Sequence, residues 1–328
     1  MTYEAGMLQG NVLDRPGGHS EFAYILDKIR DADFSDDPFR HVIIDEFLSP
    51  EHFAAVTSAP EVSRKRYGET EEMLNDLLSS GYKVQEFPGC ITSVPDYLKF
   101  VRDNEMKGSL VEGYGHGLLE GYGMTLRLMQ YQSPILEGLI AFLNTEEFRG
   151  VIADKFGVTN PTYPDTSIQK YLTGYEISPH PDTRKKALTY MLNINTDRES
   201  EDLAIHTYLL EFAPERKYVY DLWRHNLQLD RCWVPWSWCE PRKQTNRNNS
   251  IVIFRPSDDT LHAVKLNYDH LKFQRTQVYG NLWYHEKPYD YSLAWQDIDV
   301  TSKAAAVSGR KRNLVQRGVA YLNRRLNG

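Results

Sequence analysis

The sequence predicts an α+β fold in which helices in the first half of the chain support a β core formed by the second half. Helical periodicity is clearest from Pro134 to Phe156, where apolar residues recur at the spacing of a helix face. From Ser167 onward, short runs of β-branched, aromatic and other apolar residues are separated by Gly, Pro, Asn and Asp. Helices first and strands later is typical of a mixed architecture with one β core.

The first half opens with a predicted extension, residues 1–37, in which residues 21–29 form a short helix. The β-branched run that starts at His41 predicts a strand. Ser49 then caps a helix that begins at the following proline, because both residues match the preferences of a helix start. Residues 60–125 are polar, with glycines toward their end, so we expect a helical elaboration outside the regular sheet.

The second half predicts six strands, and strands separated by turn residues favour a sandwich or a barrel. The predicted strands are Ser167–Leu172, Ala187–Ile194, His206–Phe212, Ser250–Phe254, Leu261–Val264 and Arg275–Tyr284. The length of 328 residues fits two domains or one elaborated β-barrel. We expect one domain over residues 38–300, followed by a basic C-terminal helix over residues 301–328.

Composition indicates a globular protein of a reducing compartment. The sequence contains no run of about 18 apolar residues, so we expect no transmembrane helix. The first ten residues lack the basic and apolar pattern of a secretory signal. The three cysteines, Cys90, Cys232 and Cys239, are too few for a disulfide framework, which fits the cytoplasm.

The formal net charge is −7, and it is unevenly distributed. Residues 301–328 contain seven basic residues and no acidic one, so residues 1–300 carry a more negative net charge than the whole chain. An acidic body argues against a nucleic-acid binder. The basic segment is expected to pack on that body or to contact an anion or a partner, and the oligomeric state stays open.

The motif His180-Pro181-Asp182 carries the candidate chemistry. On an extended chain, residues i and i+2 project to the same face, so one strand end can present an imidazole and a carboxylate to one ion. A third ligand must come from elsewhere. Two histidines and one carboxylate leave open positions for a co-substrate and O2, as non-haem iron(II) oxygenases require.

His262 is the strongest candidate for the third ligand. It follows an apolar strand and a turn, and it opens a second apolar run, whereas His206, His225, His270 and His285 lie in less regular or polar surroundings. Thirteen residues later comes Arg275, on the next predicted strand. A guanidinium can donate two parallel hydrogen bonds to one carboxylate. Together these residues predict a metal with an anion anchor beside it.

The region from Ile168 to Tyr284 resembles the iron(II)/2-oxoglutarate-dependent dioxygenases, in particular their prolyl-4-hydroxylase-like branch. The matching features are Tyr171, Gly174 and the HxD motif, then the late histidine and Arg275. The run from His41 also resembles the opening strand and helix of that branch. One departure is Asn249-Ser250, where the family often has glycine.

The resemblance implies a double-stranded β-helix (jelly-roll, cupin-like) core and the cofactors Fe(II) and 2-oxoglutarate. His180, Asp182 and His262 would bind the iron. Arg275 would pair with the distal carboxylate of 2-oxoglutarate, and the Tyr171 hydroxyl would hydrogen-bond the same carboxylate. The implied activity is that of a hydroxylase that consumes O2 and releases succinate and CO2.

Asp182 narrows the implied reaction. Halogenating relatives carry Gly or Ala at this position, so the aspartate disfavours halogenation. Desaturation, ring formation and epimerisation use the same ligands as hydroxylation, and substrate placement decides among them. The ligand set is shared by enzymes that act on proteins, nucleic acids, lipids, sugars and amino acids, and we expect a small-molecule substrate here.

Two features are candidates for substrate binding. Arg184 belongs to the basic run that follows the HPD motif, where it would grip a carboxylate or phosphate of an anionic substrate. Trp223 belongs to an aromatic-rich segment, Tyr218–Trp238, whose length suits a lid or a wall. The competing interpretations are a solvated strand edge and a loop packed down by its tryptophans.

A non-catalytic β-barrel binding module is the alternative function. In that case the HPD motif is a turn, and the basic C-terminal helix contacts a partner. An anaerobic titration with iron(II) and 2-oxoglutarate discriminates the two, since the module would bind neither. A hydrolase has no support, because the sequence contains no GxSxG motif.

Overall fold

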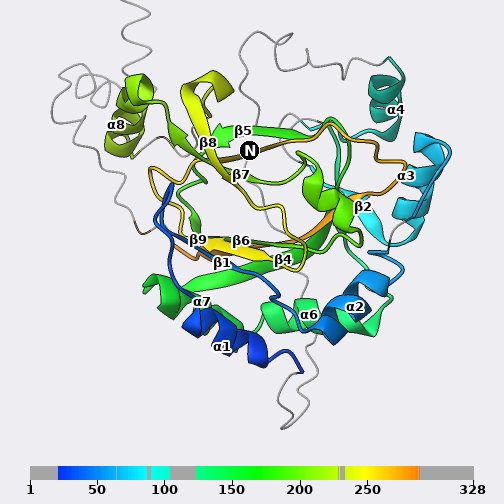
Figure 1. The fold of residues 1–328 in the computed structure, drawn as a ribbon, viewed down its shortest axis with the longest axis horizontal. Helices are drawn as coiled ribbons and strands as arrows, with labels where there is room; N and C mark the ends of the chain where they lie inside the picture. Colours follow the sequence, from blue (N-terminus) through cyan, green and yellow to red (C-terminus); the bar gives the residue numbers. More distant parts are fainter. Residues whose placement is uncertain are drawn as a thin grey trace, which may run out of the picture.

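Two antiparallel sheets form the centre of the protein, which is described here from a computed structural model (Figure 1). The structure describes residues 21–63, 65–86, 90–103, 123–227, 229, 233–286 and 288. The seven-stranded sheet has the order β1-β9-β6-β11-β4-β3-β2, and the four-stranded sheet the order β5-β10-β7-β8. The strands are β1 (His41–Ile44), β2 (Tyr82–Val84), β3 (Thr125–Leu128), β4 (Thr162–Tyr171), β5 (Glu176–His180), β6 (Lys186–Asn193), β7 (Tyr208–Phe212), β8 (Cys239–Gln244), β9 (Ile251–Phe254), β10 (His262–Lys265) and β11 (Arg275–Tyr284).

From β4 onward the chain passes back and forth between the two sheets. The strands β4, β6, β9 and β11 belong to the larger sheet, whereas β5, β7, β8 and β10 belong to the smaller one. Leu209 of β7 packs in one apolar cluster with Met191, Val252 and Phe254 of the larger sheet. The two sheets therefore face each other, and residues between them are enclosed on both sides.

Helices cover the outer face of the larger sheet. Figure 1 shows α1 (Tyr24–Asp31), α2 (Pro50–Ser58), α6 (Pro134–Leu143) and α7 (Glu146–Phe156) gathered along that face. The main apolar core lies between them and the sheet; one of its contacts joins the rings of Phe148 and Tyr190, whose centroids are 5.6 Å apart. The remaining helices are α3 (Thr70–Ser79), α4 (Val94–Arg102), α8 (Lys217–His225) and the short 3-10 turns Arg198–Asp202, Pro214–Arg216 and Trp236–Trp238.

Local signals explain where the helices begin and end. Ser49 accepts a hydrogen bond from the His52 N–H at the start of α2, as its position before proline predicted. The helical stretch predicted from Pro134 to Phe156 is two helices, because Thr145 caps a new one by accepting from the Phe148 N–H. Gly157 ends α7 in the left-handed conformation, with φ of 64°.

Each predicted strand is confirmed, whereas β2, β3 and β8 were not predicted. Residues 60–125 were expected to lie outside the regular sheet, yet β2 falls in this range and forms an edge of the seven-stranded sheet through β3. A strand of three residues is too short to show a period of two, so the pattern gave no signal for it. Residues 1–20 and the predicted basic helix over residues 301–328 lie outside the described residues. None of the helices in the described ranges combines the length and apolar character that a membrane span needs.

Gly280 in β11 provides a test of this packing. A Cβ added there would lie 2.0 Å from the ring of Tyr190, which is fully buried and cannot move aside. We expect Gly280→Ala to lower the free energy of unfolding by about 3 kcal/mol. Gly150→Ala is the control: no atom lies within 4 Å of its added Cβ on α7, and removing a helical glycine should stabilise by about 0.5 kcal/mol. Urea denaturation of both variants measures the difference, and equal stabilities would contradict the packing.

Candidate metal centre

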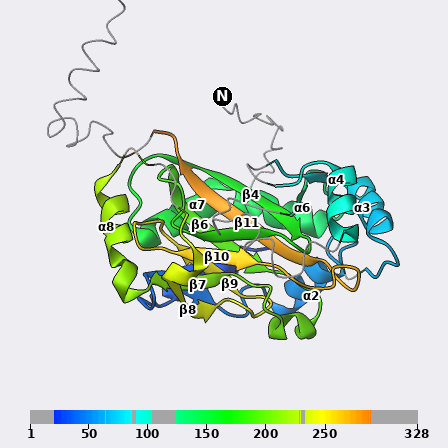
Figure 2. The same cartoon turned by 90° about the horizontal axis from the view of Figure 1, so that it is seen from above.

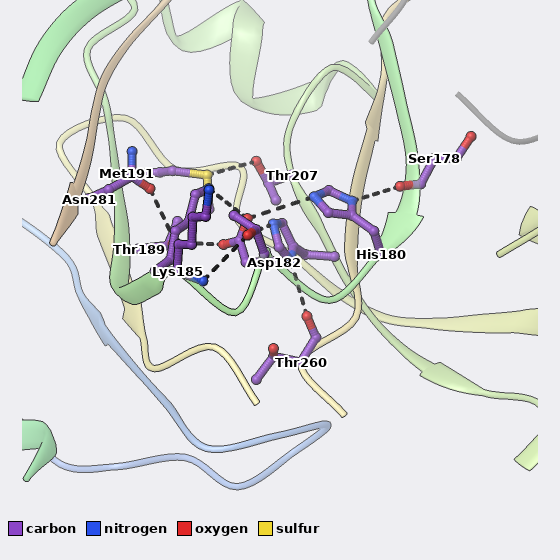
Figure 3. Close-up of polar contacts among 12 residues, drawn as sticks. Ser178, His180, Asp182, Lys185, Thr189, Met191, Thr207, Thr260 and Asn281 are labelled. Atoms are coloured by element: carbon purple, nitrogen blue, oxygen red, sulfur yellow. Dashed lines mark hydrogen bonds and ion pairs between the residues drawn. The ribbon is translucent and has the colours of Figure 1, made fainter. Parts of the chain in front are cut away.

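The pairing of β5 with β10 brings the two predicted histidine ligands together. His180 ends β5 and His262 begins β10, and the two residues are direct partners in the antiparallel register. Their ring centroids are 4.4 Å apart. Asp182 follows His180 by two residues and completes a buried group in which one ligand atom from each residue lies within 4.8 Å of the others. Figure 3 shows the side chains of His180 and Asp182 pointing toward each other.

Backbone carbonyls set the tautomer of both histidines. The Nδ1 atom of His180 lies 2.8 Å from the Ser178 carbonyl (Figure 3). Nδ1 of His262 lies 3.0 Å from the Thr260 carbonyl. A carbonyl only accepts, so Nδ1 carries the proton in each ring and Nε2 keeps a lone pair. Both Nε2 atoms face Asp182, at 3.9 Å from its Oδ1 for His180 and 3.7 Å from its Oδ2 for His262.

Burial keeps these ligands in the protonation states that a divalent metal requires. It lowers the pKa of His180 to about 3, with a further contribution from His262, and it also lowers the pKa of His262. Burial alone would raise the pKa of Asp182, but the ammonium of Lys186 and the two histidines more than offset it, so that pKa is lowered. Two neutral imidazoles and one carboxylate are therefore ready at neutral pH.

Each carboxylate oxygen of Asp182 is held by a buried donor. Lys186 Nζ donates to Oδ1 at 2.6 Å, and Thr189 Oγ1 donates to Oδ2 at 2.6 Å. Lys186 also donates to the Tyr279 hydroxyl at 2.7 Å. The ion pair raises the pKa of Lys186 against the opposing effect of burial, so the lysine stays charged. Such partners orient a ligating carboxylate and tune its strength as a donor.

Replacing Lys186 with methionine is expected to destabilise the metal-free protein by about 3 kcal/mol, because Asp182 would be left as a buried charge without its cation. Adding Mn(II) should recover much of this loss, since a divalent cation then compensates the carboxylate. Thermal unfolding with and without Mn(II) measures both effects. Lys185→Met, at an exposed neighbouring position, is the matched control. A metal-free Lys186→Met protein as stable as wild type would contradict the role of this ion pair.

Arg275 is a buried cation, and two of its donor atoms find no partner among the residues that the structure describes. It begins β11 directly opposite Tyr171, the last residue of β4, and its guanidinium carbon lies 4.6 Å from the centre of the Tyr171 ring. Its side chain is among the largest that are fully buried, and burial lowers its pKa. Within the described residues, neither Nε nor Nη2 has a hydrogen-bond partner. A buried charge with free donors indicates a site for an anion.

One cavity joins the histidine–aspartate group to Arg275. Its volume is about 360 Å³, and its walls include His180, Asp182, His262, Tyr171 and Arg275. This size lies at the lower end of ligand pockets, which span about 300–1,000 Å³. The Tyr171 hydroxyl donates to Gln169 Oε1 at 2.6 Å. The cavity thus presents a metal-binding group and an anion-binding group to the same ligand.

Arg184 and Trp223, the two residues predicted to bind substrate, contact each other instead of the cavity. The Arg184 guanidinium stacks 4.1 Å from the Trp223 ring, donates to the Trp223 carbonyl at 2.7 Å, and forms an ion pair with Asp258 at 3.0 Å. Neither residue is among those that line the cavity. Their substrate role stays a prediction that the geometry does not favour, because the Arg184 charge is already compensated.

The other histidines considered as third ligand lie outside the metal-binding group. His206 hydrogen-bonds the Ser200 carbonyl at 2.6 Å, and burial, followed by the charge of Arg275, lowers its pKa to about 4. His270 contacts Thr70 and Tyr97. Sequence reasoning missed Thr189 at the site. It included Trp233 in the aromatic-rich segment Tyr218–Trp238, considered as a lid or a wall, and Trp233 lines the cavity. It assigned the basic run that includes Lys186 to the pocket mouth. The only sequence signal for Lys186 is its position four residues after Asp182.

Solved structures that resemble this one include two prolyl hydroxylases and one epimerase. A prolyl hydroxylase from Trichoplax adhaerens, in complex with a hypoxia inducible factor peptide fragment, is 10% identical with a TM-score of 0.38; the match covers 81% of this chain and 90% of that chain. A prolyl-4-hydroxylase from Pseudomonas putida is 12% identical with a TM-score of 0.30, covering 66% and 99%. The epimerase SnoN in complex with Fe3+, alpha ketoglutarate and nogalamycin RO is 10% identical with a TM-score of 0.39, covering 82% and 87%.

The prolyl hydroxylases are of the branch that the sequence motifs resemble. No protein-family model matches the chain, and no curated protein matches it in sequence.

Proposed function

We propose that this protein is an iron(II)- and 2-oxoglutarate-dependent dioxygenase that hydroxylates an unactivated C–H bond of a small molecule. The observation that carries the proposal is one cavity that holds both a buried His-Asp-His group and a buried arginine with free donors. A metal alone would not require Arg275, and an anion alone would not require the histidines. A dicarboxylate that also chelates the metal accounts for both.

The strand order supports a double-stranded β-helix (jelly-roll, cupin-like) core for the same domain. Consecutive strands from β4 to β11 are distributed between two facing antiparallel sheets, with β7 and β8 as the one pair of neighbours that stay in the same sheet. We extend this domain over residues 38–300, as predicted, and we place the ligands at the end of β5 and the start of β10. Strand ends on a β scaffold are rigid positions for ligands.

The residues at the site fit an iron(II) ion with 2-oxoglutarate. His180, His262 and Asp182 would hold the ion. With 2-oxoglutarate, bound iron would supply the activation of O2, with release of succinate and CO2. Arg275 would bind the distal carboxylate of 2-oxoglutarate, and Tyr171 would turn its hydroxyl to the same group. Lys186 and Thr189 would hold Asp182 in place through its two oxygens.

An anaerobic titration tests the proposal without knowledge of the substrate. Adding 2-oxoglutarate to the protein with iron(II) should produce the weak visible charge-transfer band of the chelate, and either component alone should not. Turnover of 2-oxoglutarate to succinate should then rise when the right small molecule is supplied. Absence of the band, with no affinity for iron(II) or for 2-oxoglutarate, would overturn the proposal and favour a binding module.

A further inference from the structure

The cavity contains one more buried donor that the proposed function does not use. Within the described residues, Trp233 Nε1 is buried and has no hydrogen-bond partner. Trp233 lines the same cavity as the histidine–aspartate group. An N–H that stays unpaired when buried is costly, and such groups in native structures indicate a missing partner. In the proposed function, the distal carboxylate of 2-oxoglutarate accepts from Arg275, so the Trp233 N–H needs a different acceptor.

The segment that carries Trp233 is fixed against β5. The Val234 N–H donates to the Pro179 carbonyl at 2.9 Å, and Trp236 Nε1 donates to Glu176 Oε1 at 2.7 Å. As residue numbers rise from 234 to 236, their partners fall from 179 to 176, so the segment runs antiparallel to β5. This strand is at an edge of the four-stranded sheet, with β10 on its other side. The backbone that follows Trp233 is thus held against β5.

The direction of this segment separates Trp233 from the carboxylate anchor. Because the segment is antiparallel to β5, Trp233 lies toward the His180 end of that strand. Arg275 is at the other end: it pairs with Tyr171, whose ring lies 5.1 Å from that of Tyr175, just before β5 begins. A carboxylate bound by Arg275 is therefore not the acceptor for Trp233. The acceptor lies on the metal side of the cavity, where the primary substrate must approach.

The charges along the described walls indicate a neutral acceptor. Three cationic side chains line the cavity, and two of them are already compensated: Arg127 pairs with Asp165, and Lys186 pairs with Asp182. Arg275 is the third, and it serves the co-substrate. An anionic substrate group beside the metal would find no free cation among these residues, whereas an indole N–H suits an uncharged oxygen.

We propose that Trp233 is a specificity-determining residue that donates its indole N–H to an uncharged oxygen (a carbonyl, hydroxyl or ether) of the primary substrate. The substrate class is then a molecule whose target C–H bond lies close to such an oxygen. This inference rests on the proposed function for the identity of the reaction. The unpaired donor itself is a property of the cavity and can be tested separately.

The test follows the indole N–H signals of protein labelled with 15N-tryptophan, loaded with Zn(II) and 2-oxoglutarate. The chain has six tryptophans. Trp233→Phe assigns one signal by its loss, and Trp236→Phe assigns the control, whose N–H is already bonded to Glu176. Titration with N-methylacetamide, as a neutral carbonyl probe, should move the Trp233 signal downfield and saturate, while the Trp236 signal stays in place. Sodium acetate should move the Trp233 signal less.

Three results would overturn the inference. If 2-oxoglutarate alone moves the Trp233 signal to its bonded position, the N–H serves the co-substrate. If no probe moves it, the donor has no ligand. If acetate binds more tightly than N-methylacetamide, the acceptor is anionic. Measuring metal and 2-oxoglutarate binding in parallel, and repeating the N-methylacetamide titration on metal-free protein, separates this question from the proposed function. If the protein binds neither metal nor 2-oxoglutarate but the Trp233 signal still responds, the oxygenase proposal fails and the donor site stands.

Discussion

His180→Ala should abolish both iron binding and succinate formation. His180 Nε2 is one of three ligand atoms in a buried group, and its ring is fixed by the Ser178 carbonyl on one side. Removing the imidazole leaves two ligands and an enclosed space that water fills poorly. Loss of an outer partner of a ligand already costs roughly 10- to 100-fold in metal affinity, so loss of the ligand itself should cost more than about 100-fold.

Iron(II) affinity, followed anaerobically, and succinate release measure this result. His225→Ala is the control, because His225 is exposed at the end of α8 and away from the cavity. Thermal unfolding of the metal-free His180→Ala protein shows whether the fold is retained. A variant that binds iron and turns over 2-oxoglutarate as wild type does would show that the ligand assignment is wrong.

Arg275→Met should abolish 2-oxoglutarate binding while it stabilises the protein without co-substrate. The guanidinium is buried, and within the described residues two of its donors are unpaired, so it destabilises the empty protein. Methionine fills a similar volume without a charge, and we expect a gain of about 1–3 kcal/mol in the free energy of unfolding. Two charge-assisted hydrogen bonds to a carboxylate are lost on binding, which should weaken 2-oxoglutarate by at least about 100-fold.

The opposite signs of these two effects make the result specific to a ligand-binding arginine. Arg127→Met is the matched control, since Arg127 lines the same cavity but pairs with Asp165, and its removal should not stabilise the empty protein. Arg275→Lys should restore part of the affinity, because a cation remains. Iron(II) affinity should be unchanged in all three variants. If Arg275→Met destabilised the empty protein and bound 2-oxoglutarate normally, Arg275 would be a structural residue.

The three candidate ligands could be predicted because the local sequence pattern around each of them points to its role. Residues i and i+2 of an extended chain share a face, which joins His180 to Asp182. His262 was singled out by the apolar strands on either side of it, and the register places it opposite His180. The six predicted strands follow equally from alternation and turn residues.

The surroundings of the ligands could not be predicted, because they depend on tertiary contacts. Lys186 was grouped with Arg184 as one basic run, yet the two side chains differ completely in their partners. Lys186 pairs with Asp182 inside the cavity, and Arg184 stacks on Trp223 outside it. The register of β6 on β11 also shifts beside Lys186, and no sequence pattern reveals such a shift. The unpaired donor of Trp233 is likewise visible once the walls are in place.

The position of β11 determines when this protein can assemble during synthesis. Figure 2 shows β11 crossing the larger sheet, and its register places it between β4 and β6 over nearly its full length. In a nascent chain that ends before Arg275, β4 and β6 therefore each have an unpaired edge beside the slot that β11 will occupy. Such edges invite pairing with other chains until the slot is filled.

The histidine–aspartate group and Arg275 are therefore brought together only after this region is translated. His262 and Arg275 emerge from the ribosome among the last described residues, and the slot closes with the strand that carries Arg275. Pairing between segments so distant in the sequence also slows folding. The long loop between them must close, at an entropic cost, before the strands can form contacts. Until then the chain is an intermediate with an open sheet, whose unpaired strand edges favour aggregation.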